Sequence, residues 1–336
     1  MPAPSRRARA PVIPEAHHGE HERPARRGLQ DHVVFARFGA VTLVTFGVFC
    51  GLGGLLAAWL LLAHLHQAGV VTPVLLAGLF VGTPLAIVGG ARLLSIALDW
   101  SAFLDDPVRA TFKPGFASQG GIAGGACALV ATAWLAGLDV LLLLDVAALS
   151  GPLGHAIGRL GCLSYGCCHG APTTSRLAIV YTNPMSKAVR HSGLGGVPLH
   201  PAPLYSALGN LALLTGLTLL VQTLPLPNGA VAALYLVLAA AGRTWVETLR
   251  GIPTSHALGL TPFQWLSVVQ LLLAASVATA AATLGTPSPL GGPLGPSLVA
   301  VAGSPWPWVF GAVLTLCFGF QGSEIGSFCA DDRGSP

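Results

Sequence analysis

Long apolar runs, separated by short polar or Pro/Gly-rich segments, follow one another along most of the chain. A membrane-spanning helix needs roughly 20 mostly apolar residues. Seven runs satisfy this requirement, at 38–63, 73–97, 118–137, 140–160, 203–223, 229–249 and 263–285. A candidate eighth run at 298–320 is interrupted by Ser304-Pro305-Trp306-Pro307. The pattern predicts an all-α, polytopic membrane helix bundle with seven core transmembrane helices and a candidate eighth at the C-terminus.

The remaining segments divide the chain into three parts. Residues 1–31 are rich in Pro, Arg and His and poor in large apolar side chains, so we expect a disordered tail. Residues 32–286 form the membrane domain, with a long loop at 161–202. Residues 287–336 begin with a Pro/Gly linker and contain the candidate extra helix and a C-terminal tail.

Composition agrees with a membrane protein. Hydrophobic residues make up 53% of the chain and charged residues 9%, and the mean hydropathy is +0.69. That much apolar surface cannot be buried in one water-soluble domain. The net charge of +4 arises mainly from arginines in the first 37 residues, and basic patches interleaved with aromatic residues are absent, so nucleic-acid binding is excluded.

Arg159 lies near the end of the fourth apolar run, between Gly158 and Gly161. An arginine at membrane depth costs a few kcal/mol on insertion scales, so it usually faces a partner or a wet cavity. The alternative is that it extends to the interface, as a terminal position permits.

Arg243, Glu247 and Arg250 follow at spacings that share one helix face. Glu247 can therefore pair with both arginines, as a structural ion-pair ladder or as part of an anion site. A guanidinium binds phosphate in bidentate fashion, and arginines from two helices can hold a lipid phosphate from both sides.

Three cysteines cluster after Arg159: Cys162, Cys167 and Cys168. With His169, His191 and His200 they offer a set of metal ligands, but the C-x2-C pairs of structural zinc sites are missing and adjacent cysteines cannot easily bind one ion. We therefore favour a disulfide from Cys162 to Cys167 or Cys168, or plain small-residue packing, and expect no metal.

Two further features could serve a site. The rigid turn His200-Pro201-Ala202-Pro203 carries a titratable ring and leads to Tyr205, so His200 is a candidate general base or a turn cap. The glycines of Gly120-Gly121-x-x-Gly124-Gly125 favour close helix packing, with exposure of bare backbone to a cavity as the alternative.

Taken in order, these motifs resemble the prolipoprotein diacylglyceryl transferases, which are bacterial inner-membrane enzymes, over roughly residues 36–285. The matching residues are Gln119-Gly120-Gly121-Ile122-x-Gly124, Asp145, Gly158-Arg159-Leu160-Gly161, Gly166, Gly170-x-Pro172-Thr173, His200-Pro201-x-x-Leu204-Tyr205, Arg243-x-x-x-Glu247-x-x-Arg250 and Gly259-Leu260-x-x-x-Gln264. The Gly161-Cys162 and Gly166-Cys167-Cys168 segments resemble a cysteine-rich variant of this family.

The resemblance implies transfer of the diacylglyceryl group of phosphatidylglycerol to the lipobox cysteine of a prolipoprotein. It implies that Arg159 and Arg243 are catalytic and bind phosphatidylglycerol, that no cofactor is needed, and that the partners are phosphatidylglycerol, the prolipoprotein signal peptide and the bilayer. The substrate-binding residues that it implies are Arg159, Gly161, Cys162, Gly166, Cys167, His200, Tyr205, Arg243, Glu247, Arg250, Gln119, Gly120 and Gly121.

Five positions depart from the family pattern. Gln119 replaces a histidine, Cys162 an asparagine, Cys167 an acidic residue, Ala239 a tyrosine, and Phe38 a tyrosine of the first helix. Because glutamine cannot act as a base, the anion-binding half of the motif is retained while the acid/base half is changed. The alternative function is a divergent paralogue that binds anionic lipid and uses the cysteines in thiol redox chemistry. A transporter is less favoured, because repeats and broken helices are not evident.

Two arguments on orientation disagree. Lys and Arg concentrate in the tail, around residues 99–116 and in the loop at 161–202, which by the positive-inside rule predicts a cytoplasmic location for them. The family resemblance implies the opposite orientation. Because charges that bind an anionic lipid are not free topological signals, we expect the family's orientation, in the bacterial inner membrane.

Overall fold

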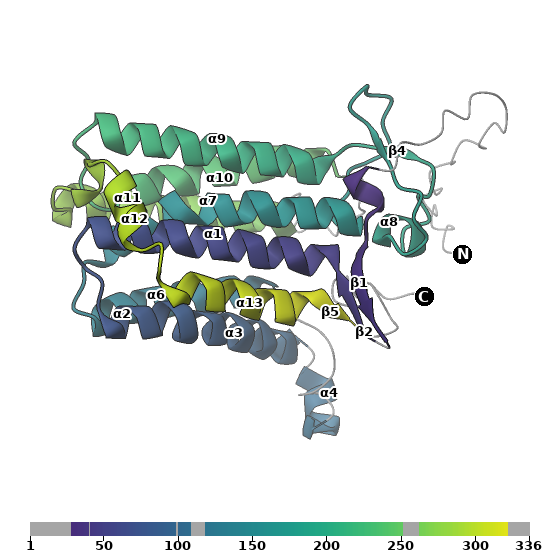
Figure 1. The fold of residues 1–336 in the computed structure, drawn as a ribbon, viewed down its shortest axis with the longest axis horizontal. Coiled ribbons are helices and arrows are strands. Elements are labelled where there is room, and N and C mark those ends of the chain that lie inside the picture. The colour runs from purple at the N-terminus through teal and green to yellow at the C-terminus, as the bar shows by residue number, and fades with distance from the viewer. Residues whose placement is uncertain (1–27, 40, 99, 109–117, 251–261, 322–336) are drawn as a thin grey trace, which may run out of the picture.

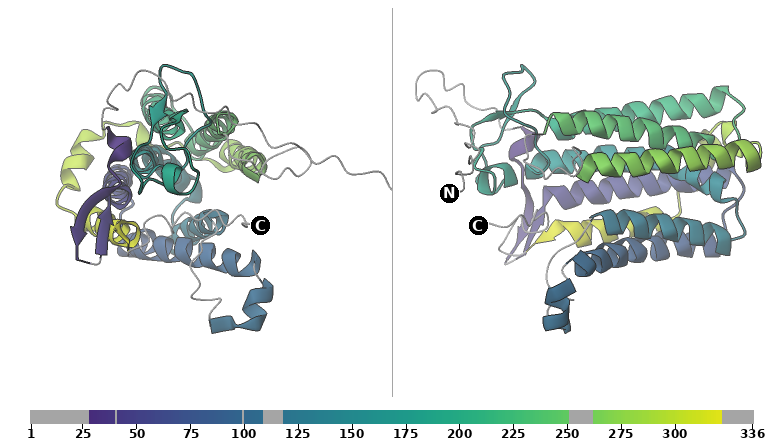
Figure 2. Two further views of the ribbon diagram at one scale, coloured as in Figure 1. Left: turned by 90° about the vertical axis from the view of Figure 1, so that its right-hand side faces the viewer. Right: turned by 180° about the vertical axis from the view of Figure 1, so that it is seen from behind.

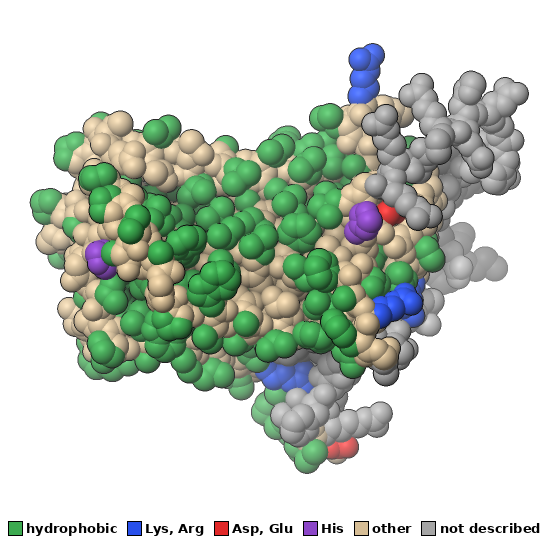
Figure 3. Space-filling view, in the orientation of Figure 1, with side chains coloured by type: hydrophobic (Ala, Val, Ile, Leu, Met, Phe, Trp, Pro, Cys, Tyr) green, Lys and Arg blue, Asp and Glu red, His purple; other side chains and the backbone are tan. Residues whose placement is uncertain are grey.

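The computed structural model describes residues 28–39, 41–98, 100–108, 118–250 and 262–321 of the chain. Its long helices lie side by side, and a small sheet and an irregular loop cover one end of the bundle (Figure 1, Figure 2). Hydrophobic side chains cover the flank of these helices (Figure 3). Leu93, Trp134 and Leu272 are each at least 65% exposed, as expected of side chains that face lipid.

Six helical segments of the described chain are long and apolar enough to cross a membrane. They are α1 (Thr45–Gln67), the continuous α2, η2 and α3 (Pro73–Ala77, Gly78–Gly82 and Thr83–Leu98), α7 (Val140–Tyr165), α9 (Ala202–Thr223), α10 (Ala230–Thr248) and α11 (Pro262–Leu284). The helix α6 (Ser118–Leu135) forms at the place predicted for the third span. The predicted all-α membrane bundle is therefore confirmed.

The candidate eighth span is shorter than predicted. It consists of α12 (Gly295–Ala300) and α13 (Pro305–Gly319), separated at the predicted interruption around Ser304. At 1.5 Å per residue, the 15 residues of α13 extend about 22 Å, less than the ~30 Å hydrocarbon core. A 3-10 turn, η3 (Pro289–Gly291), precedes them in the predicted linker.

The N-terminal boundaries of the prediction are wrong by several residues. The first span begins at Thr45, because β1 (Val34–Phe38) and β2 (Val41–Val44) form an antiparallel hairpin that β5 (Phe320–Gln321) extends to a three-stranded sheet. Phe38 therefore lies on a strand, 60% exposed and with its ring 6.4 Å from that of Phe320, and does not belong to the first helix. Most of the predicted tail lies outside the described residues, but Leu29–Asp31 form an ordered 3-10 turn, η1.

Glycines let the helices approach closely at three crossings. A Cβ on Gly53 would lie 2.8 Å from the carbonyl oxygen of Gly154 at the α1–α7 contact, and one on Gly120 would overlap the carbonyl oxygen of Gly90 at the α3–α6 contact. Gly51 packs in the same way against Gly311 of α13. The predicted packing role of the small residues around Gly120 is thus confirmed.

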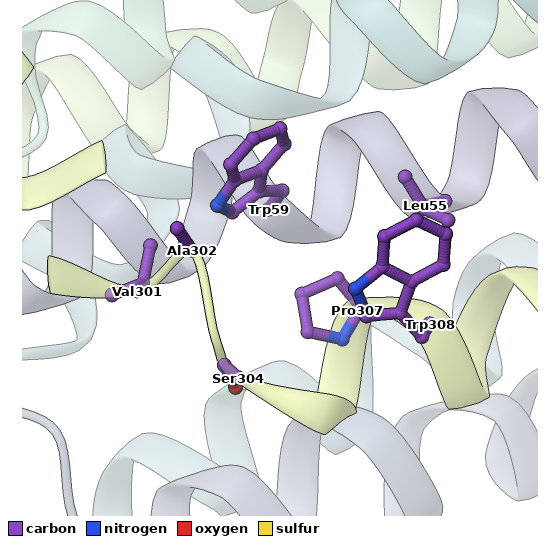
Figure 4. Close-up of a pocket in the computed structure, with 7 residues that line it drawn as sticks. All are labelled: Leu55, Trp59, Val301, Ala302, Ser304, Pro307 and Trp308. Atoms are coloured by element: carbon purple, nitrogen blue, oxygen red, sulfur yellow. The ribbon is translucent and has the colours of Figure 1, made fainter. Parts of the chain in front are cut away.

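A small hollow lies between α1 and the link from α12 to α13, with Trp59 on one side and Trp308 on the other (Figure 4). Its lining contains no charged side chain, so it offers no cation to a lipid phosphate. The candidate residues of the sequence lie elsewhere, at the end of the bundle that carries the sheet and the loop.

The loop between α7 and α9 folds against that end. It contains β3 (Ile179–Val180), which pairs antiparallel with β4 (Pro198–Leu199), and the short helix α8 (Lys187–Arg190). Asp31 fastens the N-terminal turn to it, because its carboxylate accepts hydrogen bonds from the backbone N–H groups of Thr182 at 2.9 Å and Asn183 at 3.1 Å. Asp31 therefore ties the loop to the N-terminal turn that precedes β1.

Candidate anion-binding site at the end of α7 and α10

The two helices that carry the arginines are held in a common register by Asp145. This residue of α7 is fully buried, and its carboxylate oxygens accept hydrogen bonds from the backbone N–H groups of Gly229 and Ala232, each at 2.7 Å. These groups belong to the first turn of α10, whose N–H groups have no partner within their own helix. Asp145 therefore caps α10 from a neighbouring helix.

This cap sets the depth of both arginines. Arg159 follows Asp145 by 14 residues (159 − 145), and Arg243 follows Gly229 by 14 residues (243 − 229). At 1.5 Å per residue each arginine lies about 21 Å from the cap. The guanidinium groups consequently arrive at the same end of the bundle, where Arg159 and Arg250 both act electrostatically on Arg243.

His155 orients Arg159. It lies one turn earlier on α7, and its Nε2 accepts a hydrogen bond of 3.0 Å from Nε of Arg159. The acceptor role requires an unprotonated Nε2, and the bond leaves the two terminal nitrogens of the guanidinium for another ligand. The sequence analysis did not identify His155, although its i, i+4 spacing to Arg159 is the signal that could have revealed it.

Glu247 pairs with Arg250. The Oε2 atom of the glutamate lies 3.3 Å from Nη1 of the arginine, and both side chains are about 90% buried. Glu247 also acts electrostatically on Arg243, in keeping with the predicted shared face. Burial lowers the pKa of Arg250, but the negative charges of Cys168 and Glu247 outweigh it and raise this pKa overall. Three arginines thus gather beside one carboxylate, which leaves the site positive.

The loop is held directly against this end of α10. The N–H of Gly170 donates to the carbonyl of His200 at 3.0 Å, and that of Ala171 donates to the carbonyl of Leu249 at 2.9 Å. A Cβ on Gly170 would lie within 3 Å of both carbonyl oxygens, so only glycine fits. Nδ1 of His200 lies 3.5 Å from the hydroxyl of Tyr205, at the long limit for a hydrogen bond.

The three clustered cysteines lie beside the arginines. Their sulfur atoms all lie within 4.8 Å of one another. Hydrogen bonds from the Cys162 and Cys167 thiols hold the pKa of Cys168 well below its usual range, and Arg159 and Arg250 lower it further. Within the described residues no disulfide forms, so the first alternative predicted for Cys162, a disulfide, is wrong. The second alternative, small-residue packing, is confirmed, because the three cysteines pack together with Val33 and Tyr165.

The backbone explains why two adjacent cysteines reach one point. Gly166 ends α7 in the left-handed region at φ 72°, and Cys168 is also left-handed at φ 58°. Side chains of neighbouring residues normally diverge, but this turn brings the Cys167 and Cys168 sulfurs back toward Cys162. The two adjacent cysteines therefore bring their sulfurs close enough to Cys162 to act on one ligand, although adjacent cysteines do not easily bind one ion. Among the described histidines none joins the cluster, and His169 contacts Ser192 instead, with 3.2 Å between Nε2 and Oγ.

The structure places the other predicted residues away from this cluster or leaves them undescribed. Gly161 packs against Phe46 and Phe49 of α1, and Gly120 and Gly121 pack against α3. The side chain of Gln119 and all of Gly259 and Leu260 lie outside the described residues. Contact of these residues with a substrate stays a prediction.

The fold and the site together define a polytopic helical membrane protein with a positively charged site at one end of its bundle. The chain belongs to the prolipoprotein diacylglyceryl transferase family, whose model matches residues 32–280. The match covers all three arginines and the cysteine cluster but not α12 and α13. Membership confirms the family predicted from the ordered motifs.

Individual relatives agree with this assignment. The chain is 30% identical over 244 residues to a phosphatidylglycerol–prolipoprotein diacylglyceryl transferase 2 of Clostridium perfringens, covering 71% of this chain and 91% of the relative. It is 30% identical over 243 residues to the enzyme of Clostridium tetani, covering 72% and 94%. It is 32% identical over 208 residues to that of Gloeobacter violaceus, covering 59% and 74%.

Proposed function

We propose that the protein transfers the diacylglyceryl group of phosphatidylglycerol to the lipobox cysteine thiol of a prolipoprotein, in the bacterial inner membrane. The observation that carries this proposal is the convergence of Arg159, Arg243 and Arg250 beside a single carboxylate at the end of a membrane bundle. An excess of partly buried positive charge at that place favours an anionic ligand, and phosphatidylglycerol is an anionic lipid.

The reaction follows from the charges. The phosphodiester of phosphatidylglycerol binds the terminal nitrogens of Arg159, which the hydrogen bond from Nε to His155 does not occupy. When a thiolate attacks the glyceryl carbon, a C–S bond forms and the C–O bond to phosphate breaks. Glycerol 1-phosphate then leaves with an additional negative charge. Preorganised arginines stabilise that charge as it develops, which is the largest contribution that such a site can make.

Arg243 and Arg250 have different roles in this site. Arg250 is paired with Glu247, which fixes the position of its guanidinium. Arg243 experiences the repulsion of both other arginines, which an anionic ligand relieves. We therefore assign Arg159 and Arg243 to the reacting phosphate and Arg250 with Glu247 to the support of that site.

Complementation tests the proposal. Cells depleted of their own diacylglyceryl transferase, when they express this chain in the membrane, should regain lipidated lipoproteins, which radiolabelled palmitate or a gel-mobility shift detects. Arg159→Ala and Arg243→Ala should abolish the rescue at equal membrane abundance. Failure of the wild-type chain to restore lipidation despite good membrane expression contradicts the proposal. Binding of anionic lipid without lipidation would instead support the divergent-paralogue alternative.

A further inference from the structure

We propose that Cys162, Cys167 and Cys168 form a zinc site whose fourth coordination position receives the thiol of the lipobox cysteine. This inference rests on the proposed function, because it assigns the activation of the thiol substrate to a metal. The three thiols belong to no part of the anion site, yet they lie within electrostatic reach of Arg159 and Arg250.

The geometry of the sulfurs fits zinc. In a tetrahedral site with Zn–S bonds of about 2.3 Å, the sulfurs lie about 3.8 Å apart. The three sulfurs here already lie within 4.8 Å of one another, so side-chain rotations that move them by about an ångström complete the set. Catalytic zinc sites keep three protein ligands and one open position, whereas structural sites use four. Three cysteines without a histidine match the catalytic arrangement.

Two buried hydroxyl groups near the thiols could donate hydrogen bonds to thiolate ligands. Tyr181 and Ser186 are completely buried, and their hydroxyl oxygens have no hydrogen-bond partner among the described residues. Ser186 Oγ lies directly against Gly166, the residue before Cys167, and Tyr181 lies within electrostatic reach of all three thiols. Metal-bound thiolates accept hydrogen bonds from such outer hydroxyl groups, which would satisfy both.

Charge favours the complete site. Three thiolates around Zn²⁺ carry a net charge of −1, which the neighbouring Arg159 and Arg250 stabilise. Zinc has no redox chemistry and binds sulfur well, so the metal needs no oxidant or reductant. A divalent cation alone would be repelled by three arginines, but the thiolate complex as a whole is not.

The site then performs one step of the transfer. The lipobox thiol binds the open position of the zinc and loses its proton to water, because metal coordination deprotonates thiols. The bound thiolate attacks the glyceryl carbon of phosphatidylglycerol held at Arg159. The C–S bond forms, the C–O bond breaks, and the electron pair leaves on glycerol 1-phosphate, which takes up the proton. The thioether product is a weaker ligand than a thiolate and leaves the metal.

Cobalt substitution of the full-length protein in detergent tests the site without relying on activity. The wild-type chain should bind about one Co²⁺ per molecule and show thiolate-to-cobalt charge-transfer absorption. Cys162→Ala, Cys167→Ala and Cys168→Ala should each reduce bound metal at least tenfold. Cys127→Ala and Cys317→Ala, on α6 and α13, are the matched controls and should bind as the wild type does. Normal gel-filtration profiles would establish that the variants are folded.

A second measurement tests the open position. A lipobox peptide should shift the cobalt d–d bands, and the same peptide with serine in place of cysteine should leave them unchanged. Absence of bound cobalt and zinc, or bands that the cysteine peptide does not change, overturns the inference. Rescue of lipoprotein lipidation by the three cysteine variants also overturns it while leaving the proposed function intact. An intact cobalt site in a chain that releases no glycerol 1-phosphate overturns the proposed function instead.

Discussion

Replacement of Asp145 by alanine should loosen the contact that places Arg159 and Arg243 at one depth. The carboxylate accepts two hydrogen bonds of 2.7 Å from buried N–H groups at the start of α10. A buried donor left without a partner costs about 1–3 kcal/mol, so two cost about 2–6 kcal/mol. The substitution also removes the cost of keeping a carboxylate buried, which offsets part of this loss. We therefore expect the free energy of unfolding to fall by about 3 kcal/mol, in the lower half of that range.

A loss of this size is measurable as thermal inactivation in detergent. Each kcal/mol shifts the midpoint of a large domain by roughly 2–4 °C, so Asp145→Ala should lower it by about 6–12 °C. Asp145→Asn, which retains one acceptor oxygen, should lower it by about half as much. Lipidation in depleted cells should also fall, because a displacement of about 1 Å between reacting groups can cost 100-fold in rate.

Asp139→Asn is the control for this experiment. Asp139 caps α7 itself, where one carboxylate oxygen accepts from the N–H of Leu141 at 2.9 Å in an exposed contact. Its other oxygen accepts from the side-chain amide of Asn228 at 2.8 Å, so the control also lies at the start of α10 but leaves the buried backbone N–H groups of Gly229 and Ala232 paired. Asparagine caps helices about as well as aspartate, so this change should cost less than about 1 kcal/mol. A midpoint for Asp145→Ala that equals that of Asp139→Asn would refute the claim that the buried cap sets the register.

Three further substitutions probe the site. His155→Ala should raise the apparent KM for phosphatidylglycerol about tenfold and leave the thermal midpoint unchanged. His155→Gln keeps an acceptor for Nε of Arg159 and should restore most of the affinity. Equal effects of the two substitutions would contradict an orienting role for His155. Gly170→Ala should lower the thermal midpoint and lipidation, because the added Cβ would lie within 3 Å of two carbonyl oxygens. Gly151→Ala, where the added Cβ meets open space, should be tolerated. Equal midpoints for the two variants would contradict the claim that the contact at Gly170 holds the loop against α10. Arg243→Lys keeps the charge but loses the planar fork, and should reduce kcat/KM by about 10²-fold in a transfer assay; wild-type rates would show that charge alone suffices.

The spans could be predicted because membrane length demands long apolar runs, and their ends could not. Val41–Val44 is apolar enough to continue a span, but it forms a strand that pairs with Val34–Phe38 on one side and with Phe320–Gln321, nearly 300 residues away, on the other. Such a contact leaves no local signal. The interruption of the eighth run was predictable, because its prolines are visible in the sequence. The length of its helix was not, because α13 packs along α1 over a distance that the local sequence does not indicate.

The site was predictable to the extent that it depends on residue type and spacing. Arg159, Arg243 and Arg250 stand out in a chain with few charges, and the spacing of Glu247 from Arg243 and Arg250 predicts that these three share a helix face. The close approach of Cys167 and Cys168 to Cys162 could not be predicted, because the left-handed backbone of Cys168 cannot be anticipated for a residue other than glycine. His155 was missed because a histidine within an apolar helix is not informative by itself. Its role is evident only from its hydrogen bond with Arg159, one turn later.

Release of glycerol 1-phosphate from phosphatidylglycerol vesicles tests the central claim most directly. Purified, zinc-loaded protein with a lipobox peptide should release one glycerol 1-phosphate for each thioether formed, and Arg159→Ala and Arg243→Ala should reduce the rate by 10² to 10³-fold. A folded wild-type protein that binds these vesicles but releases no glycerol 1-phosphate, or arginine variants that release it at the wild-type rate, would contradict the account.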